Sequence, residues 1–105
     1  MQPQNERQFM DNIIRFAHLR GWRLVHQRPA RLADGSWRTA ICGHAGYPDV
    51  TMVRDGVLIF AELKTDKGKL SGEQKDWIRD LERVQGIIVR VWRPSDWPEI
   101  EKLLM

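Results

Sequence analysis

Two carboxylates and a lysine are spaced so that they can meet on one face of a β-hairpin. Asp55-Gly56 is a favoured two-residue hairpin turn and lies between two short apolar runs. The register set by that turn places Asp49 directly opposite Glu62, with Cβ atoms about 5 Å apart. Lys64 follows Glu62 by two residues and therefore projects from the same face of its strand.

Two facing carboxylates require a compensating interaction, because like charges that face each other within a sheet destabilise the sheet. A proton on one carboxyl group relieves the repulsion, and so does a bound cation. The alternative is an exposed hairpin whose Asp, Glu and Lys side chains form a solvated network. Apolar neighbours favour an interior position for the strands, namely Val50, Met52, Leu58, Ile59 and Phe60.

A cation at this position points to phosphodiester chemistry. Mg²⁺ takes oxygen ligands, and one or two carboxylates together with water and phosphate suffice to hold it. A bound divalent cation activates water and stabilises the charge that develops on a phosphodiester under attack. Lys64 would then orient the water or balance the phosphate charge.

The elements that must position these residues follow from local signals. Asn5 with Gln8, and Ser71 with Gln74, form two capping boxes, and Gly86 is expected to end the second helix. The expected elements are a helix over 6–20, a strand over 22–26, strands over 49–54 and 57–64, a helix over 72–85, a strand over 87–92 and a short helix over 96–104.

Residues 27–47 are too long for an unstructured loop inside a compact domain. Asp34-Gly35 is a turn signal, so a short hairpin with Trp37–Cys42 as its second arm is expected there. The resulting order is α-β-(β)-β-β-α-β-α, which predicts an α/β fold with a mixed sheet flanked by helices.

Length and composition restrict the class of protein. The chain of 105 residues suits one domain, and its hydrophobic fraction of 42% is enough for a core. One cysteine excludes a disulfide framework, and no apolar run is long enough to span a membrane. The net charge of +3 makes nucleic acid a reasonable partner.

The ordered motifs of residues 46–74 resemble the PD-(D/E)xK nuclease signature, and more narrowly the virus-type replication-repair nuclease module, VRR-NUC. The motifs are Gly46-Tyr47-Pro48-Asp49, Glu62-Leu63-Lys64, Gly68-Lys69-Leu70-Ser71 and Gln74, followed by a Val-Arg-Val strand.

The resemblance implies a restriction-endonuclease-like fold and a metal-dependent endonuclease. By this resemblance, Mg²⁺ or Mn²⁺ would be held by Asp49, Glu62 and the backbone carbonyl of Leu63, and Lys64 would be the catalytic lysine.

Two further residues carry over from the resemblance. Family members often supply a carboxylate from the first helix, and Glu6 is the candidate, although an acidic residue at a helix start is also favoured by the helix dipole. Gln74 lies on the apolar stripe of its helix, where a polar side chain needs a partner. Its alternative role is capping alone.

Several basic residues are candidates for contacts with DNA phosphates. Lys67 and Lys69 follow the strand of Glu62 and Lys64, and Lys75 begins a stripe on the next helix. That stripe also suits a solvated helix face, because acidic residues share the helix.

The 27–47 segment suits either a DNA groove or a dimer interface, and the sequence does not separate the two. A zinc site is not expected, because the chain has no CxxC or paired-histidine spacing. The residues of this segment that suit a DNA groove or a dimer interface are Arg28, Arg31, Trp37, Arg38 and His44.

The sequence therefore predicts a divalent-metal-dependent DNA endonuclease. Stand-alone modules similar to this one are homodimers that cut branched DNA such as Holliday junctions, so branched DNA, a homodimer and a cytoplasmic location in a bacterial or phage-infected cell are expected. The alternatives are a general or nicking endonuclease, or a non-catalytic DNA-binding module on the same fold.

Overall fold

The computed structural model describes residues 5–27, 30–31, 33–35, 37–38 and 42–105, with backbone only for residues 30–31 and 37–38. The N-terminal part runs through α1 (Glu6–Leu19), β1 (Arg23–His26) and a small hairpin of β2 (Ala30–Arg31) and β3 (Trp37–Arg38). The remainder contains β4 (Val50–Arg54), β5 (Val57–Leu63), α2 (Gly72–Glu82), β6 (Ile88–Trp92), a 3₁₀ turn (Pro94–Asp96) and α3 (Trp97–Leu104).

The central sheet is mixed, with strand order β1-β4-β5-β6. β1, β4 and β5 pair antiparallel, whereas β5 and β6 are parallel and joined through α2. The register predicted for the central hairpin is confirmed, from Arg54 opposite Val57 to Val50 opposite Ala61. Asp55 and Gly56 have φ angles of 49° and 81°, and this pair of positive values is what a primed two-residue turn requires.

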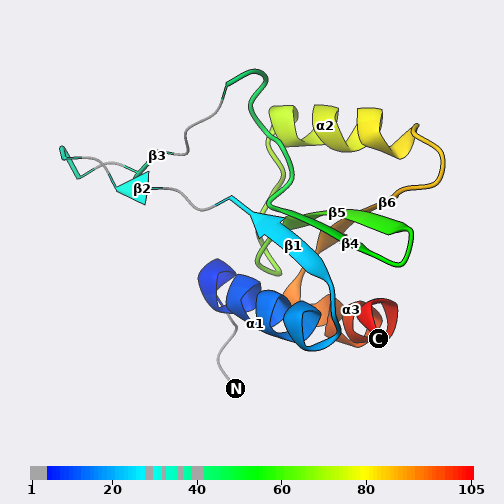
Figure 1. The fold of residues 1–105 in the computed structure, drawn as a ribbon. Coiled ribbons are helices and arrows are strands. Elements are labelled where there is room, and N and C mark those ends of the chain that lie inside the picture. Colours follow the sequence, from blue (N-terminus) through cyan, green and yellow to red (C-terminus); the bar gives the residue numbers. More distant parts are fainter. Residues whose placement is uncertain (1–4, 28–29, 32, 36, 39–41) are drawn as a thin grey trace.

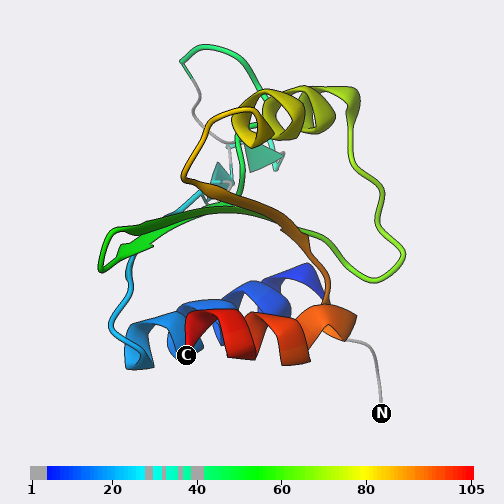
Figure 2. The same cartoon turned by 90° about the vertical axis from the view of Figure 1, so that its right-hand side faces the viewer.

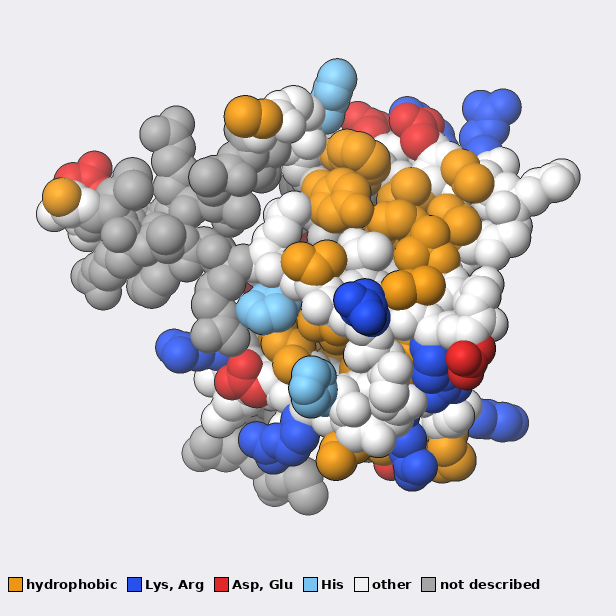
Figure 3. Space-filling model, viewed as in Figure 1, with side chains coloured by type: hydrophobic (Ala, Val, Ile, Leu, Met, Phe, Trp, Pro, Cys, Tyr) orange, Lys and Arg blue, Asp and Glu red, His pale blue; other side chains and the backbone are white. Residues whose placement is uncertain are grey.

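Helices cover the two faces of the sheet unequally. α1 and α3 lie side by side on one face, and α2 alone lies on the other (Figures 1 and 2). Strand alternation sends Ile59, Ala61 and Leu63 of β5 toward α1 and α3, where all three are fully buried. Figure 3 shows apolar side chains still exposed to solvent beside and below α2.

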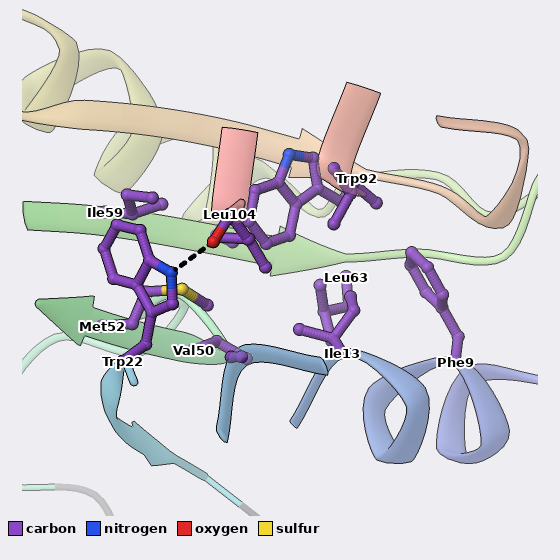
Figure 4. Close-up of a cluster of buried hydrophobic side chains, with 12 residues drawn as sticks. Phe9, Ile13, Trp22, Val50, Met52, Ile59, Leu63, Trp92 and Leu104 are labelled. Atoms are coloured by element: carbon purple, nitrogen blue, oxygen red, sulfur yellow. Dashed lines mark hydrogen bonds between the residues drawn. The ribbon is translucent and has the colours of Figure 1, made fainter. Parts of the chain in front are cut away.

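The main core lies between the sheet and the α1–α3 layer (Figure 4). At its edge the indole Nε1 of Trp22 donates to the carbonyl of Leu104 at 2.9 Å. Arg54 stacks over the Trp22 ring, 4.4 Å from its centroid, and donates to the carbonyls of Arg20 and Leu104. These contacts join the end of α1 to the end of α3.

Both predicted capping boxes are present, at Asn5 with Gln8 and at Ser71 with Gln74. The prediction for the end of the second helix is wrong, because α2 stops at Glu82 rather than near residue 85. The backbone N–H groups of Arg83 and Val84 bond three residues back, to Asp80 and Leu81. This tightening ends the α-helix early and leaves Gly86 in the turn before β6.

The segment before β4 contains the expected hairpin in a shorter form. β2 and β3 pair antiparallel, with Ala30 opposite Arg38 and Arg31 opposite Trp37. The two strands form a ribbon of their own that extends away from the central sheet (Figure 1). Residues 39–41 of the predicted second arm lie outside the described residues.

The observed order of elements agrees with an α/β fold built on a mixed sheet flanked by helices. Among the described residues, no helix combines the length and the apolar character needed to cross a membrane.

Candidate active site

Asp49 and Glu62 come together at one end of the central hairpin, as the register predicts. Asp49 directly precedes β4, and Glu62 is the penultimate residue of β5. The carboxylate Oδ2 of Asp49 accepts a hydrogen bond from the backbone N–H of Leu63 at 2.9 Å, and its backbone carbonyl accepts from Gln27 at 3.0 Å. Asp49 is therefore held both through its side chain and through its main chain.

Among the described residues, Glu62 is the one charged residue that is buried, with 1% of its surface exposed. Its Oε1 accepts a hydrogen bond from Nε2 of Gln74 at 3.0 Å. Its Oε2 is buried and no donor among the described residues reaches it. The facing carboxylate of Asp49 offers only acceptor oxygens, so a hydrogen bond between the two groups requires one shared proton.

The surroundings of Glu62 favour its neutral form. Burial raises the pKa of Glu62 from 4.5 to about 9, and the facing carboxylate of Asp49 adds to the rise. The positive charge of Lys64 opposes it, whereas the negative charge of Glu6 raises this pKa further. Without a cation, the pair of carboxylates is thus stabilised by keeping a proton.

Leu63 and Lys64 point in directions that follow from strand alternation. The Leu63 side chain is buried in the main core, while its backbone N–H points toward Asp49. The carbonyl of the same residue leaves the strand on that side too. The next N–H, that of Lys64, donates to Trp92 of β6 at 3.0 Å. The half-buried Lys64 side chain consequently shares the face of Glu62.

Gln74 performs both of the roles that the sequence left open. Its Oε1 accepts from the backbone N–H of Ser71 at 2.9 Å, which completes the capping box of α2. Its Nε2 donates to Glu62 at the same time. One amide therefore joins the start of α2 to the carboxylate pair.

The segment that leads into Asp49 is packed against α2. Gly46 has a φ of +93°, and a Cβ added there would lie 2.5 Å from the backbone carbonyl carbon of Glu73. Tyr47 makes edge-to-face contact with Trp77 at 5.1 Å and its hydroxyl lies 3.2 Å from Oγ1 of Thr51. Only glycine fits the approach of the loop to α2, and this approach sets the position of Asp49 relative to Gln74.

Tyr47 was not singled out from the sequence as a positioning residue. Neither were Arg93 and Asp66, which tie the loop after β5 to the end of β6. The presence of Tyr47 within the Gly46–Asp49 motif was an available signal. No local pattern marks the side chain of Arg93, because the carbonyls to which it donates lie more than twenty residues away in the chain.

The other predicted site residues lie on four different parts of the fold around the carboxylate pair. Glu6 is exposed in the first turn of α1, and its charge acts on Glu62. Lys67 and Lys69 are exposed on the loop that follows β5, and Lys75 is exposed on α2. Arg38 lies on β3, in the ribbon that extends away from the sheet (Figure 1), so the fold does not bring its backbone to the carboxylate pair.

The donors around Glu62 suit the metal site that the resemblance implies. Within the described part of the chain, no group of three or more His, Cys, Asp or Glu side chains is arranged to hold a metal ion. The implied site needs fewer side chains, because it uses two carboxylates and one backbone carbonyl. The facing carboxyl groups and the unpartnered Oε2 of Glu62 suit a cation that keeps water and phosphate as its remaining ligands.

Comparison with known proteins does not assign the chain to a family. No protein-family model matches its sequence, and no curated protein is significantly similar to it.

Proposed function

We propose that this chain is a divalent-metal-dependent DNA endonuclease of the VRR-NUC type, with the restriction-endonuclease-like fold. The observation that carries the proposal is the carboxylate pair formed by the buried Glu62 and the half-buried Asp49, with Lys64 directly after β5 on the face of Glu62. The pair is unfavourable for folding unless it binds a proton or a cation. A local conflict of this kind is expected at a functional site.

Each residue of the site has a role in this proposal. Asp49, Glu62 and the carbonyl of Leu63 would hold Mg²⁺ or Mn²⁺, which supplies Lewis-acid charge and a more acidic water when bound. Gln74 orients Glu62 through its amide, and Oε2 of Glu62 accepts no hydrogen bond from the described residues. Lys64 orients the attacking water or balances the charge of the phosphate. Glu6 is a further carboxylate at the edge of the site.

DNA would reach the site along the exposed lysines of the loop after β5. Lys67 and Lys69 leave β5 directly beyond Lys64, so phosphates on either side of the scissile bond could contact them. Lys75 on α2 is a further contact. Arg38 would contribute only to DNA that extends past the body of the protein, as a branched molecule does.

The proposed substrate is branched DNA, and the proposed active form is a homodimer. A specific protein–DNA interface buries about 1,000–2,500 Å² of protein surface, whereas the whole chain exposes 7617 Å². A single copy would have to commit a large share of its surface to a four-way junction. In a homodimer, each copy would supply part of the contact surface, and one active site would face each of two DNA strands.

The test is cleavage of a labelled four-way junction, a linear duplex and a single strand, each with Mg²⁺, Mn²⁺ or EDTA. Lys64→Ala is expected to lower the cleavage rate at least about 100-fold while the chain still binds DNA. Lys102→Ala is the matched control, because Lys102 is exposed on α3, on the opposite side of the sheet, and should cleave normally.

The ranking of the three substrates decides between a structure-specific and a general or nicking endonuclease. Cleavage by Lys64→Ala at the wild-type rate would remove Lys64 from the mechanism. Binding of DNA by the wild type without cleavage in any metal would favour the non-catalytic DNA-binding module instead.

A further inference from the structure

The loop between β5 and α2 forms a tight turn that carries two of the proposed DNA-binding lysines. The backbone N–H of Gly68 donates to the carbonyl of Thr65 at 3.1 Å, which closes the turn. Lys67 and Lys69 are exposed on it. A Cβ added to Gly68 would lie 3.5 Å from Cδ of Lys64, so the turn packs beside the aliphatic part of the Lys64 side chain.

Arg93 holds this turn from the end of β6. Its Nη1 donates to the carbonyl of Thr65 at 2.6 Å and to the carbonyl of Gly68 at 2.7 Å. One guanidinium nitrogen therefore bonds both ends of the turn. Such bonds from a charged donor are shorter and stronger than those between neutral groups.

A second contact ties the same two segments together. Oδ1 of Asp66 accepts from the backbone N–H of Ser95 at 3.0 Å. The backbone N–H of Arg93 in turn donates to Oδ2 of Asp96 at 2.9 Å, which steadies the 3₁₀ turn that carries Ser95. The loop after β5 is thus bonded from two directions by the residues that follow β6.

This arrangement has a consequence for catalysis. The turn lies outside the sheet, so without Arg93 the carbonyl of Thr65 would keep only its bond from the N–H of Gly68, and the carbonyl of Gly68 would turn to water. The turn that packs beside the side chain of Lys64 would then be held less firmly, with the Asp66–Ser95 contact as its remaining tie to the end of β6. Misplacement of a reacting group by about 1 Å is enough to cost a large factor in rate.

We infer that Arg93 is a positioning residue, which fixes the 65–68 turn so that Lys64 and the lysines of the loop face the DNA backbone together. Arg93 contributes through carbonyl groups of the turn and does not contact the substrate. The inference rests on the proposed function, because the reaction that Lys64 serves is part of that proposal.

The experiment compares Arg93→Ala and Arg93→Lys with Arg90→Ala. Arg90 is an exposed arginine of β6, the strand that ends just before Arg93, and among the described residues its Nη1 donates to the adjacent carbonyl of Val89 at 3.0 Å. Three quantities are measured: hydrogen exchange of residues 64–70, the salt dependence of DNA binding, and the single-turnover cleavage rate with DNA in excess of its Kd.

Arg93→Ala should accelerate hydrogen exchange in residues 64–70 and slow cleavage at saturating DNA by about 10-fold or more. The slope of log K against log salt should become shallower by about 1, as for the loss of one phosphate contact. Arg93→Lys should recover part of all three, because an ammonium can still donate to two carbonyls. Arg90→Ala should match the wild type throughout.

Unchanged hydrogen exchange in Arg93→Ala would overturn the inference. Faster exchange with wild-type cleavage and salt slope would also overturn it, since Arg93 would then be merely structural. If Arg93→Ala does not fold, Arg93→Lys and Asp66→Ala decide by the same three measurements. A wild type that binds DNA but does not cleave would reject the proposed function, while exchange and salt slope would still test the positioning of the lysines.

Discussion

The two faces of the central sheet differ in how their helices are attached. On one face, α1 and α3 insert side chains that are completely buried, among them Phe9, Ile13, Ile100 and Leu104. On the other face, no residue of α2 is fully buried. α2 is instead held by specific contacts, through Gly46 at its start and through Gln74 to Glu62.

This difference separates the part of the molecule that supplies stability from the part that carries the proposed active site. Burial of apolar surface is the dominant favourable term in folding, and it is concentrated between α1, α3 and the sheet. A site that must admit a large polar substrate needs access to solvent. On the α2 face Asp49 and Lys64 are half-buried rather than sealed in the core, and hydrogen bonds and close backbone contacts keep the carboxylate pair in place.

The sharpest test of the comparison uses the same substitution on both faces. Ile13 of α1 has no exposed surface, whereas Ile78 of α2 is half-buried. Ile13→Ala should lower the free energy of unfolding by about 2–5 kcal/mol, because it leaves a cavity in a packed core. Ile78→Ala should cost clearly less, as measured by urea denaturation. Equal losses would mean that α2 is packed as firmly as α1.

A smaller effect is expected when the close contact of α2 is disturbed. Gly46→Ala places a Cβ 2.5 Å from the backbone of Glu73, and its φ of +93° adds strain of about 1–3 kcal/mol. Gly43→Ala is the control, because Gly43 has a φ of +112° but nothing lies within 4 Å of its added Cβ.

The difference in melting temperature between these two variants measures the contact alone. Gly46→Ala should be the less stable variant and should displace Gln74 from Glu62. A pair of variants with the same stability would show that the start of α2 can shift without cost.

The third test follows the pH dependence of stability in metal-free buffer with EDTA, which reports whether Glu62 on the α2 face holds a proton. The pKa of Glu62 is raised from 4.5 to about 9 in the folded state, so above pH 4.5 the unfolded chain loses a proton that the folded chain keeps. The free energy of unfolding should therefore decline as the pH rises from about 4.5 to 9, by at most about 1.4 kcal/mol per pH unit.

Glu62→Gln removes the titratable carboxyl group and keeps a carbonyl oxygen that can accept the hydrogen bond from Gln74. Its stability, followed by denaturation at a series of pH values, should fall less steeply than that of the wild type over the same window. Parallel curves for the two proteins would show that Glu62 is ionised at neutral pH and that its charge is satisfied by the protein.

Several parts of the fold and the site were predictable because they depend on neighbours in the chain. The capping boxes at Asn5 and Ser71 use residues three positions apart, and the Asp55-Gly56 turn sets the register of its own hairpin. That register alone places Asp49 opposite Glu62, without any tertiary contact. The end of α2 was not predictable in this way, because Gly86 is a helix stop only if the helix reaches it.

The site also contains features that no local pattern reports. The burial of Glu62 requires α2 to lie over β5, and its bond to Gln74 requires both ends of the connection to be placed. A glutamine at a capping position shows in the sequence, whereas its second hydrogen bond does not.

Interactions between neighbours in the chain are enough to predict most of the elements, the hairpin register and the residues that could bind a cation. Three features arise only in the packed molecule: the burial of Glu62, the close contact of Gly46 with α2, and the hydrogen bonds from Arg93 to a turn 25–28 residues away in the chain. The physical reason is the range of the interactions. Turns and caps are set by a few adjacent dihedral angles, whereas burial and long-range hydrogen bonds exist only once the chain has closed its loops and packed its layers.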